Sequence, residues 1–256
     1  MNVATQTTTL QGAAEKTSEP SHAPRLKELR QRYVDTGMED FVRAMITREF
    51  PGKIALVSSF GTESASLLHM VAQVDRATPI IFLDTGKLFG ETQRYREQLV
   101  NHLGFTDVRR ILPDPKAIAA RDPKGILWSQ NHDACCALRK IEPLENALKP
   151  FSAWFTGRKA YQSPTRARLQ LVEWEGGYFK LNPLVTASRA EIEDYFQRHD
   201  LPRHPLEADG YLSIGCIPCT TRVAPGEDAR AGRWRGTEKT ECGIHAPPLA
   251  EIVPTC

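Results

Sequence analysis

The chain has 256 residues, of which 41% are hydrophobic and 25% are charged, as in ordinary globular proteins. The formal net charge of +2 is too small to indicate a nucleic-acid or membrane-surface partner, and we expect neither. No run approaches the roughly 18 apolar residues of a membrane span, and the N-terminus lacks the apolar core of a secretion signal. We therefore expect a cytoplasmic protein, in which six cysteines indicate metal binding or thiol chemistry rather than a disulfide framework.

Hydrophobic periodicity predicts the first elements in chain order. Residues 1–24 are polar and aperiodic, which predicts a disordered leader. Apolar residues at helical spacing predict two helices from Arg25 to Ile46, with a break near Thr36-Gly37. Strands are expected at residues 53–60, 79–84, 108–112 and 153–156. Helices are expected at residues 63–74, 90–103, 115–120 and 133–148.

The second half continues this alternation and then changes character. Residues 169–174 and 178–181, joined by two glycines, predict a hairpin. Residues 188–199 predict a helix, with Ser188 and Glu191 as a capping box. The whole pattern predicts an α/β protein with an open, mostly parallel sheet flanked by helices. From residue 201 onward prolines, glycines and arginines dominate, which predicts loops laid over the site.

A loop of small residues follows the first strand. Its sequence is SSFGTES, and in open α/β sheets ligands bind outside the carboxyl ends of the strands. Backbone N–H groups, hydroxyls and a helix N-terminus could hold a phosphate there, although neither standard glycine-rich phosphate motif is present. The alternative is a tight turn with a Ser/Thr cap. The candidate contacts are Ser58, Ser59, Phe60 and Gly61.

Two polar residues end the second predicted strand. Asp84 and Thr85 should lie at the same edge of the sheet as the first loop. Asp84 could hold a ribose or order its loop, and an Asx turn is the alternative.

Four cysteines form two tight pairs. Cys135 and Cys136 are adjacent, whereas Cys216 and Cys219 have the spacing that structural zinc sites use. A cubane cluster presents separate iron corners, so that neighbouring thiolates can each bind one iron. The four thiols therefore favour a [4Fe–4S] cluster over zinc, and zinc over four unrelated buried thiols.

Basic residues surround these pairs in the sequence. Lys140 follows Cys136 by four residues and should share its helix face. Further cations lie in the loops that the topology places near the phosphate site: Arg139, Arg158, Lys159, Arg166, Arg168, Arg230, Arg233 and Arg235. Such arginines are usually solvated, but a doubly anionic small substrate would explain their clustering.

A fifth cysteine, Cys242, lies in the segment ECGIH. Gly243 allows a close bend around the thiol, and His245 and nearby cations could lower its pKa. A nucleophile on a flexible tail could close over a substrate and then reach another protein. The alternative is an unstructured tail with a spare thiol, which is also our interpretation of Cys256.

Taken together, these residues resemble the assimilatory sulfonucleotide reductases, in particular their iron–sulfur, thioredoxin-dependent adenosine 5′-phosphosulfate (adenylyl-sulfate) reductases. The first loop also resembles the SGGxDS-type loop of the adenine-nucleotide α-hydrolase superfamily, with Phe60 in place of a glycine. The resemblance runs from about Lys53 to His245. It is carried by SSFGTES, LDTGKLFGET, CCxxRK, TGRKAYQSPTR, GYLSIGCIPCT, RxxRW and ECGIH.

The resemblance implies an adenine-nucleotide α-hydrolase-like fold and a specific reaction. Cys242 would attack the sulfate sulfur, AMP would leave, and thioredoxin or glutaredoxin would release sulfite from the thiosulfonate. A [4Fe–4S] cluster on Cys135, Cys136, Cys216 and Cys219 would lie near the substrate without passing electrons, linked to it by Lys140. Substrate contacts would come from Ser58, Ser59, Phe60, Gly61, Lys140, Gly157, Arg166, Arg230, Arg233 and His245.

This interpretation organises the chain into a leader (1–24), a nucleotide- and cluster-binding α/β domain (25–225) and a flexible catalytic tail (226–256). The family usually has a proline before Glu91-Thr92, where this chain has Gly90, and the QSPTR segment is one residue shorter than usual. No thioredoxin-like segment follows, so the reductant is expected to be a separate protein. A preference for the 3′-phosphorylated substrate, dual use of both substrates, and a nucleotide sensor that does not react are the alternatives; a homo-oligomer is left open.

Overall fold

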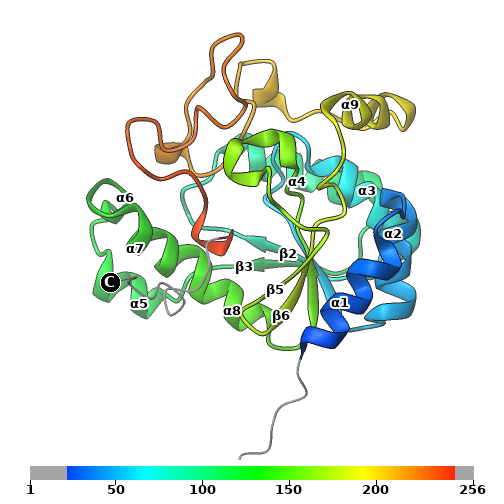
Figure 1. Ribbon diagram of the computed structural model, residues 1–256. Helices are drawn as coiled ribbons and strands as arrows, with labels where there is room; N and C mark the ends of the chain where they lie inside the picture. The colour runs from blue at the N-terminus through cyan, green and yellow to red at the C-terminus, as the bar shows by residue number, and fades with distance from the viewer. Residues whose placement is uncertain (1–21, 246–256) are drawn as a thin grey trace, which may run out of the picture.

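The computed structural model describes residues 22–245 and contains one six-stranded sheet (Figure 1). The strands are β1 (Ile54–Val57), β2 (Ile80–Leu83), β3 (Val108–Ile111), β4 (Ala153–Phe155), β5 (Val172–Glu175) and β6 (Tyr178–Leu181). Their order is β3-β2-β1-β4-β6-β5, and every pairing is parallel except that of β5 with β6. The predicted mostly parallel sheet and the predicted hairpin are therefore confirmed.

Helices cover both faces of this sheet. They are α1 (His22–Tyr33), α2 (Met38–Ala44), α3 (Ser64–Val74), α4 (Gly90–Leu103), α5 (Pro115–Arg121), α6 (Leu127–Gln130), α7 (His132–Cys136), α8 (Glu142–Leu148) and α9 (Arg189–Arg198). In Figure 1, α1 to α3 lie on one side of the sheet, and α5, α7 and α8 lie on the other. The short helix α6 is the one helix of this set that the sequence patterns did not predict.

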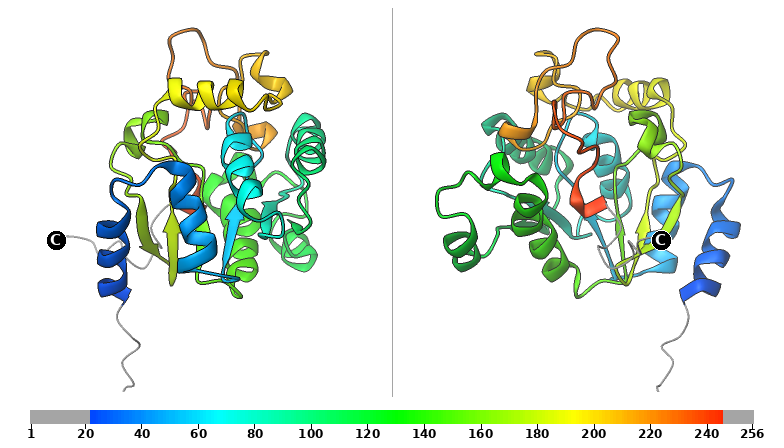
Figure 2. Two further views of the ribbon diagram at one scale, coloured as in Figure 1. Left: turned by 90° about the vertical axis from the view of Figure 1, so that its right-hand side faces the viewer. Right: turned by 60° about the vertical axis from the view of Figure 1, so that its left-hand side comes forward.

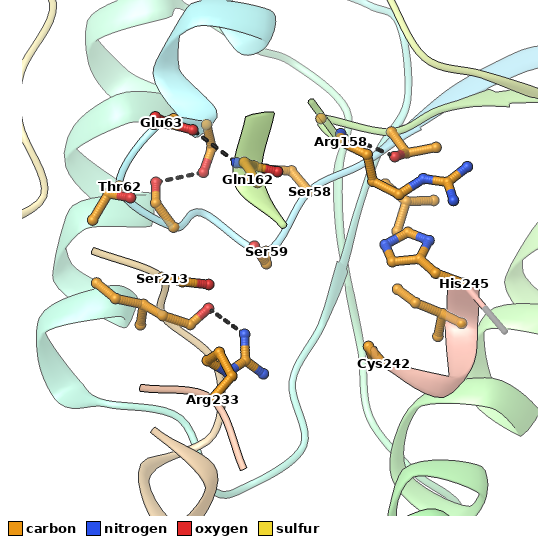
Figure 3. Close-up of a pocket in the computed structure, with 18 of the residues that line it drawn as sticks. Ser58, Ser59, Thr62, Glu63, Arg158, Gln162, Ser213, Arg233, Cys242 and His245 are labelled. Carbon is orange, nitrogen blue, oxygen red and sulfur yellow. Dashed lines mark hydrogen bonds between the residues drawn. The ribbon is translucent and has the colours of Figure 1, made fainter. Parts of the chain in front are cut away.

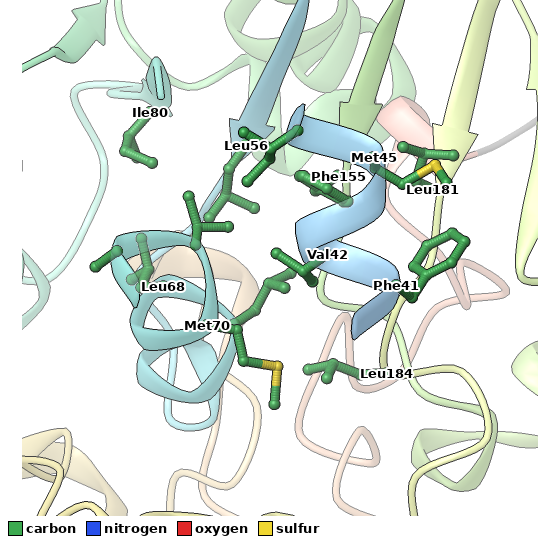
Figure 4. Packing of buried hydrophobic residues seen from close by; sticks show 14 of the residues in the cluster. Phe41, Val42, Met45, Leu56, Leu68, Met70, Ile80, Phe155, Leu181 and Leu184 are labelled. Carbon is green, nitrogen blue, oxygen red and sulfur yellow. The ribbon is translucent and has the colours of Figure 1, made fainter. Parts of the chain in front are cut away.

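Alternate residues of the central strands β1, β2 and β4 face two hydrophobic cores. Ile54 and Leu56 of β1 belong to the larger core, which contains residues of α1 to α4 and α9. Figure 4 shows part of this core, with Leu56 of β1, Val42 of α2 and Leu68 of α3. Ala55, between Ile54 and Leu56, faces a smaller core, where Leu144 and Leu148 of α8 pack against the sheet. This period of two is the ordinary consequence of strand geometry, and burial on both faces explains the apolar run in β1.

The helix predicted at residues 133–148 is interrupted by a π-helical turn. Helix α7 starts after Asn131, whose side chain accepts a hydrogen bond from the Ala134 N–H, and ends at Cys136. A π turn at Ala137–Ile141 follows, and α8 then continues to Leu148. Single π turns inside helices often occur at functional sites. Here the turn carries Lys140.

Two boundaries differ from the sequence predictions. Helix α1 begins at His22, so the last three residues of the predicted leader are helical. The rest of the leader, and Cys256, lie outside the described residues. The second helix also does not end with α2 but continues as a π turn at Met45–Glu49.

Residues 201–245 form the predicted loops, which lie at one end of the sheet (Figure 2, orange to red). Isolated bridges pair Cys216 with Leu88 and Thr220 with Arg233. The bridge between Cys216 and Leu88 brings the second cysteine pair to the loop that follows β2. Within residues 22–245, none of the helices has the length and apolar character that crossing a bilayer would require.

Candidate active site

A cleft of about 190 Å³ opens at the carboxyl ends of β1 and β4 (Figure 3). The order of the strands reverses between these two neighbours, because the chain continues from β1 to one side and from β4 to the other. Such a switch point is where open α/β sheets bind ligands. The lining includes residues 61–64 of the first loop, residues 156–159 after β4, residues 212–215, and the tail residues Glu241, Cys242, Ile244 and His245.

The first loop contributes Ser58, Ser59 and Gly61 to the cleft, but not Phe60. The backbone of Phe60 is left-handed, with φ of 50°, and its fully buried ring packs edge-on against Phe82 at 5.4 Å. The N–H of Phe60 is also occupied, because it donates to Ser58 Oγ at 3.2 Å. The prediction that Phe60 contacts the substrate is therefore wrong for its side chain, which belongs to the core.

Glu63 ties the first loop to the loop after β4. Its carboxylate pairs with Lys159 at 3.1 Å and accepts hydrogen bonds from Tyr161 at 2.6 Å and Gln162 at 2.8 Å. Gly157, a predicted contact, also lines the cleft. These bonds fix the two walls of the switch point relative to each other.

Cys242 lies inside the cleft, with 9% of its surface exposed. Lys140 Nζ lies 3.8 Å from its sulfur, so the π turn and the tail meet at this point. The turn after Cys242 passes so close to the π turn that a Cβ on Gly243 would lie 2.6 Å from Ile141 Cδ1. A larger residue at position 243 would therefore require the Ile141 side chain to shift.

The tail is also held beyond the cysteine. Lys180, which is fully buried on β6, donates to the carbonyl of Ile244 at 3.3 Å and pairs with Glu175 at 2.7 Å. The His245 ring stacks over Trp154, with ring centres 6.1 Å apart. The sequence patterns gave no signal for Lys180, because its partner is a backbone carbonyl 64 residues away.

The surroundings of Cys242 favour a thiolate. A hydrogen bond with the Cys136 thiol and the positive charge of Lys140 lower the pKa of Cys242, against the opposing effect of burial. His245 does not supply charge, because burial and the repulsion of Lys180 and Arg158 hold the pKa of its ring well below the usual range. The expected electrostatic effect of His245 on the thiol is therefore not supported; the cations that lower the pKa of Cys242 are Lys140 and, to a smaller extent, Arg233.

Glu241 holds two of the predicted substrate-binding arginines. Its carboxylate accepts two hydrogen bonds from Arg166, at 2.7 and 2.9 Å, and one from Arg230 at 2.8 Å. Burial opposes the charge of this carboxyl, but the arginines lower its pKa to about 2. Sequence reasoning missed this residue, although it is the first of the ECGIH segment.

The six basic residues that line the cleft differ in their pairing. Four of them form ion pairs: Arg158 with Glu173, Lys159 with Glu63, and both Arg166 and Arg230 with Glu241. Lys140 and Arg233 have no carboxylate partner among residues 22–245. The guanidinium of Arg233 makes long contacts of 3.4 Å to the carbonyls of Cys219 and Ile214 and lies over the Trp234 ring, 4.4 Å from its centre. These two cations are the ones most available to an anionic ligand.

Beside the cleft, all four paired cysteines line one small cavity. Cys135 and Cys136 come from α7, Cys219 ends the 3₁₀ turn Ile217–Cys219, and Cys216 is the residue that caps the start of that turn. Among the described residues no three His, Cys, Asp or Glu side chains converge closely enough to hold a single metal ion. Four thiols spread around a cavity are a donor set that fits a thiolate-held cluster.

Thr85 and Arg139 support this cavity, whereas Asp84 forms the Asx turn. Thr85 Oγ1 lies 3.3 Å from Cys216 Sγ. Arg139 donates to the Thr85 carbonyl at 2.9 Å and pairs with Asp122 at 2.5 Å. Asp84 accepts from the Gly86 N–H at 3.0 Å and from Arg110, so it orders its own loop and does not line the cleft.

Comparison with known proteins shows the family to which the chain belongs. The phosphoadenosine phosphosulfate reductase domain matches residues 53–222. Two relatives named adenosine 5′-phosphosulfate reductase are those of Mesorhizobium japonicum, 54% identical over 78% of this chain and 79% of that protein, and of Chelativorans sp., 48% identical over 88% and 92%. A relative in Gloeobacter violaceus, 39% identical over 86% and 93%, is named phosphoadenosine 5′-phosphosulfate reductase.

Solved structures agree as well. The phosphoadenylyl-sulfate reductase of Candida auris aligns with a TM-score of 0.66 and 25% identity, over 80% of this chain and all of that one. The FMN adenylyltransferase of Candida glabrata shares the fold, with a TM-score of 0.51 and 16% identity over 82% and 69% of the two chains. The expected adenine-nucleotide α-hydrolase-like fold is thereby confirmed. The chain belongs to the sulfonucleotide reductase family, through its phosphoadenosine phosphosulfate reductase domain.

Proposed function

We propose that this protein reduces adenosine 5′-phosphosulfate to sulfite and AMP in assimilatory sulfate reduction. The observation that carries the proposal is the position of Cys242, whose thiol lies inside the switch-point cleft, 3.8 Å from Lys140. The names of the relatives from Mesorhizobium and Chelativorans support the same substrate.

In the first step the Cys242 thiolate attacks the sulfur of the sulfate group. An S–S bond forms, the bond between sulfur and the bridging oxygen breaks, and AMP leaves with that oxygen. Lys140 and Arg233 neutralise the phosphosulfate. They are available for this role because no carboxylate within residues 22–245 pairs with them, whereas the other basic residues of the cleft are paired. Ser59, Gly61 and the start of α3 are the proposed contacts of the nucleotide phosphate.

In the second step a dithiol protein completes the reduction. One thiolate of thioredoxin or glutaredoxin attacks Cys242 Sγ, which releases sulfite and leaves a mixed disulfide. The second thiol of that protein resolves the disulfide, so both electrons come from the dithiol. Because Cys242 is buried, the tail must open between the two steps. A separate cytoplasmic reductant fits this requirement.

We further propose that Cys135, Cys136, Cys216 and Cys219 hold a [4Fe–4S] cluster. Such a cluster would supply an electrostatic field beside the substrate, without passing electrons to it. As a ligand Cys136 has no S–H to donate to Cys242, so the groups that then stabilise the thiolate are Lys140, the backbone N–H of Ile244 and Arg233, with Lys140 the largest contributor. Lys140 also lines both the cysteine cavity and the cleft, which is the position that a link between them requires.

Two measurements test these proposals. Incubation with adenosine 5′-phosphosulfate without reductant should add one SO₃ group to the Cys242 peptide; an unmodified Cys242 in active protein would refute the mechanism. The spectrum of anaerobically purified protein should show the broad visible absorbance of a cluster. A colourless protein with stoichiometric zinc would refute the cluster.

The second candidate substrate is the 3′-phosphorylated nucleotide. It is favoured by the name of the Gloeobacter relative and by the Candida auris structure. Steady-state kinetics with both nucleotides decides between the two. A preference of tenfold or more for the 3′-phosphorylated form, about 1.4 kcal/mol, would reverse our assignment.

A further inference from the structure

The carboxylate of Glu241 is a junction between the tail and the body of the protein. It receives three hydrogen bonds from Arg166 and Arg230, and its Oε1 also accepts from the N–H of Cys242 at 3.0 Å. Arg166 is 75 residues away, on the 3₁₀ turn Pro164–Arg166 beyond β4. The residue next to the reactive cysteine is therefore fixed to a wall of the cleft.

This junction is shielded from water. The side chains of both arginines are 9% exposed and that of Glu241 is 18% exposed. Charge-assisted hydrogen bonds, especially two-pronged ones from arginine, are stronger and more directional than neutral ones. Lys180 anchors the tail on the other side of Cys242 through the Ile244 carbonyl. The thiol is thus held between two anchors.

The two arginines differ in the donors that the pairing leaves free. All three guanidinium nitrogens of Arg166 already donate, Nε and Nη2 to Glu241 and Nη1 to Gln162, whereas Arg230 keeps a free donor. Arg230 contacts Glu241 and the Thr240 carbonyl through Nη2 alone. Its Nε is buried and has no hydrogen-bond partner within the described residues. One edge of Arg230 can therefore hold Glu241 while another edge meets a bound anion, so that ligand binding does not require Glu241 to leave.

We infer that Glu241 is a positioning residue that latches the tail through Arg166 and Arg230 and thereby keeps the Cys242 thiol in the cleft beside Lys140. The inference rests on the proposed function in one respect, which is the reaction that Cys242 carries out. The latch itself is a property of the ligand-free protein. It assigns to Arg166 the task of holding the tail, and to Arg230 the two tasks of holding the tail and meeting the substrate.

The test compares Glu241→Gln with the matched control Glu238→Gln. Glu238 is exposed on the same tail and makes no ion pair within residues 22–245. In anaerobically purified protein without ligand, alkylation of Cys242 by iodoacetamide is followed by peptide mass spectrometry, which separates it from the other cysteines. The control should match the wild type. The Cys242 thiol of Glu241→Gln should react at least tenfold faster. This corresponds to a loss of about 1.4 kcal/mol from the free energy that favours the closed over the open position of the tail.

Calorimetric measurement of AMP binding distinguishes two roles of the Glu241 carboxylate: it latches the tail, or it occupies the place of an anionic ligand and competes with it. A latch predicts that Glu241→Gln binds AMP within about twofold of the wild type, while kcat falls by more than KM changes. An unchanged alkylation rate would overturn the inference, and so would AMP binding that becomes tenfold tighter, because Glu241 would then be a stand-in for the ligand. Arg166→Lys keeps the charge but loses the two-pronged contact, and it should also speed alkylation.

The alkylation rate and the AMP affinity do not depend on turnover, whereas kcat and KM do. If SO₃ never appears on Cys242 of the wild type, the proposed function fails while the latch can still be confirmed by alkylation. If the wild type reduces its substrate normally but Glu241→Gln leaves alkylation unchanged, the latch alone fails.

Discussion

Replacing Lys180 with Met should keep or raise the free energy of unfolding and at the same time lower kcat. Lys180 is fully buried between Glu175, Trp154 and the Ile244 carbonyl. Burial and the repulsion of Arg158 lower its pKa to about 8, although Glu175 opposes the change. The ordinary value of 10.5 exceeds this by 2.5, so the charged lysine costs the folded state about 3 kcal/mol at neutral pH.

Methionine has a similar length and removes that cost. Glu175 keeps part of its side chain exposed, at 26%, and can turn to water when its partner is lost. We therefore expect Lys180→Met to unfold with a free energy at least equal to that of the wild type and at most about 3 kcal/mol higher. The variant also loses the hydrogen bond to Ile244, which should loosen the tail by about 1 kcal/mol and lower kcat several-fold.

The pH dependence gives an independent check with a definite sign. Between pH 8 and 10.5 the unfolded chain keeps the Lys180 proton that the folded protein has lost, so stability due to this group rises with pH. Urea unfolding should be measured for both proteins at pH 8.0 and 9.5. Between these pH values the unfolding free energy of the wild type should increase relative to that of Lys180→Met by roughly 1–2 kcal/mol. A variant that is less stable than the wild type by more than about 1 kcal/mol, with no difference in pH dependence, would refute the reasoning.

Four further substitutions test the site and the core beside it. Cys242→Ser should abolish sulfite release while AMP still binds; residual turnover above background would remove the thiol from the mechanism. Lys140→Ala should lower kcat/KM by at least tenfold, about 1.4 kcal/mol, and leave any visible absorbance in place, because its charge faces Cys242 at 3.8 Å; unchanged kinetics would exclude it from the site. Cys219→Ser should lose colour and activity together, and an active, colourless variant would make the cluster dispensable. For Phe60→Ala, loss of the buried ring should cost about 3–5 kcal/mol in unfolding free energy; a change below 1 kcal/mol would contradict its place in the core.

The sequence by itself determined the alternation of strands and helices, because each element buries one face and so imposes a local hydrophobic period. It therefore predicted β1, β2, α3 and α4 to within a few residues. It also singled out the paired cysteines and Cys242, since few residue types can bind a cluster or act as a thiolate, and their spacing is visible without a fold.

Tertiary structure decided which charges remain available and which side chains reach the cleft. Arg166 was expected to meet the substrate, but its guanidinium also holds Glu241, 75 residues away, and no sequence period links the two. Phe60 was placed in the phosphate loop, yet a left-handed φ turns its ring into the core. His245 is neutral because burial and neighbouring cations remove its proton. Side-chain direction, burial and long-range ion pairing depend on the assembled chain, and these determined how the predicted residues divide between the substrate and the tail.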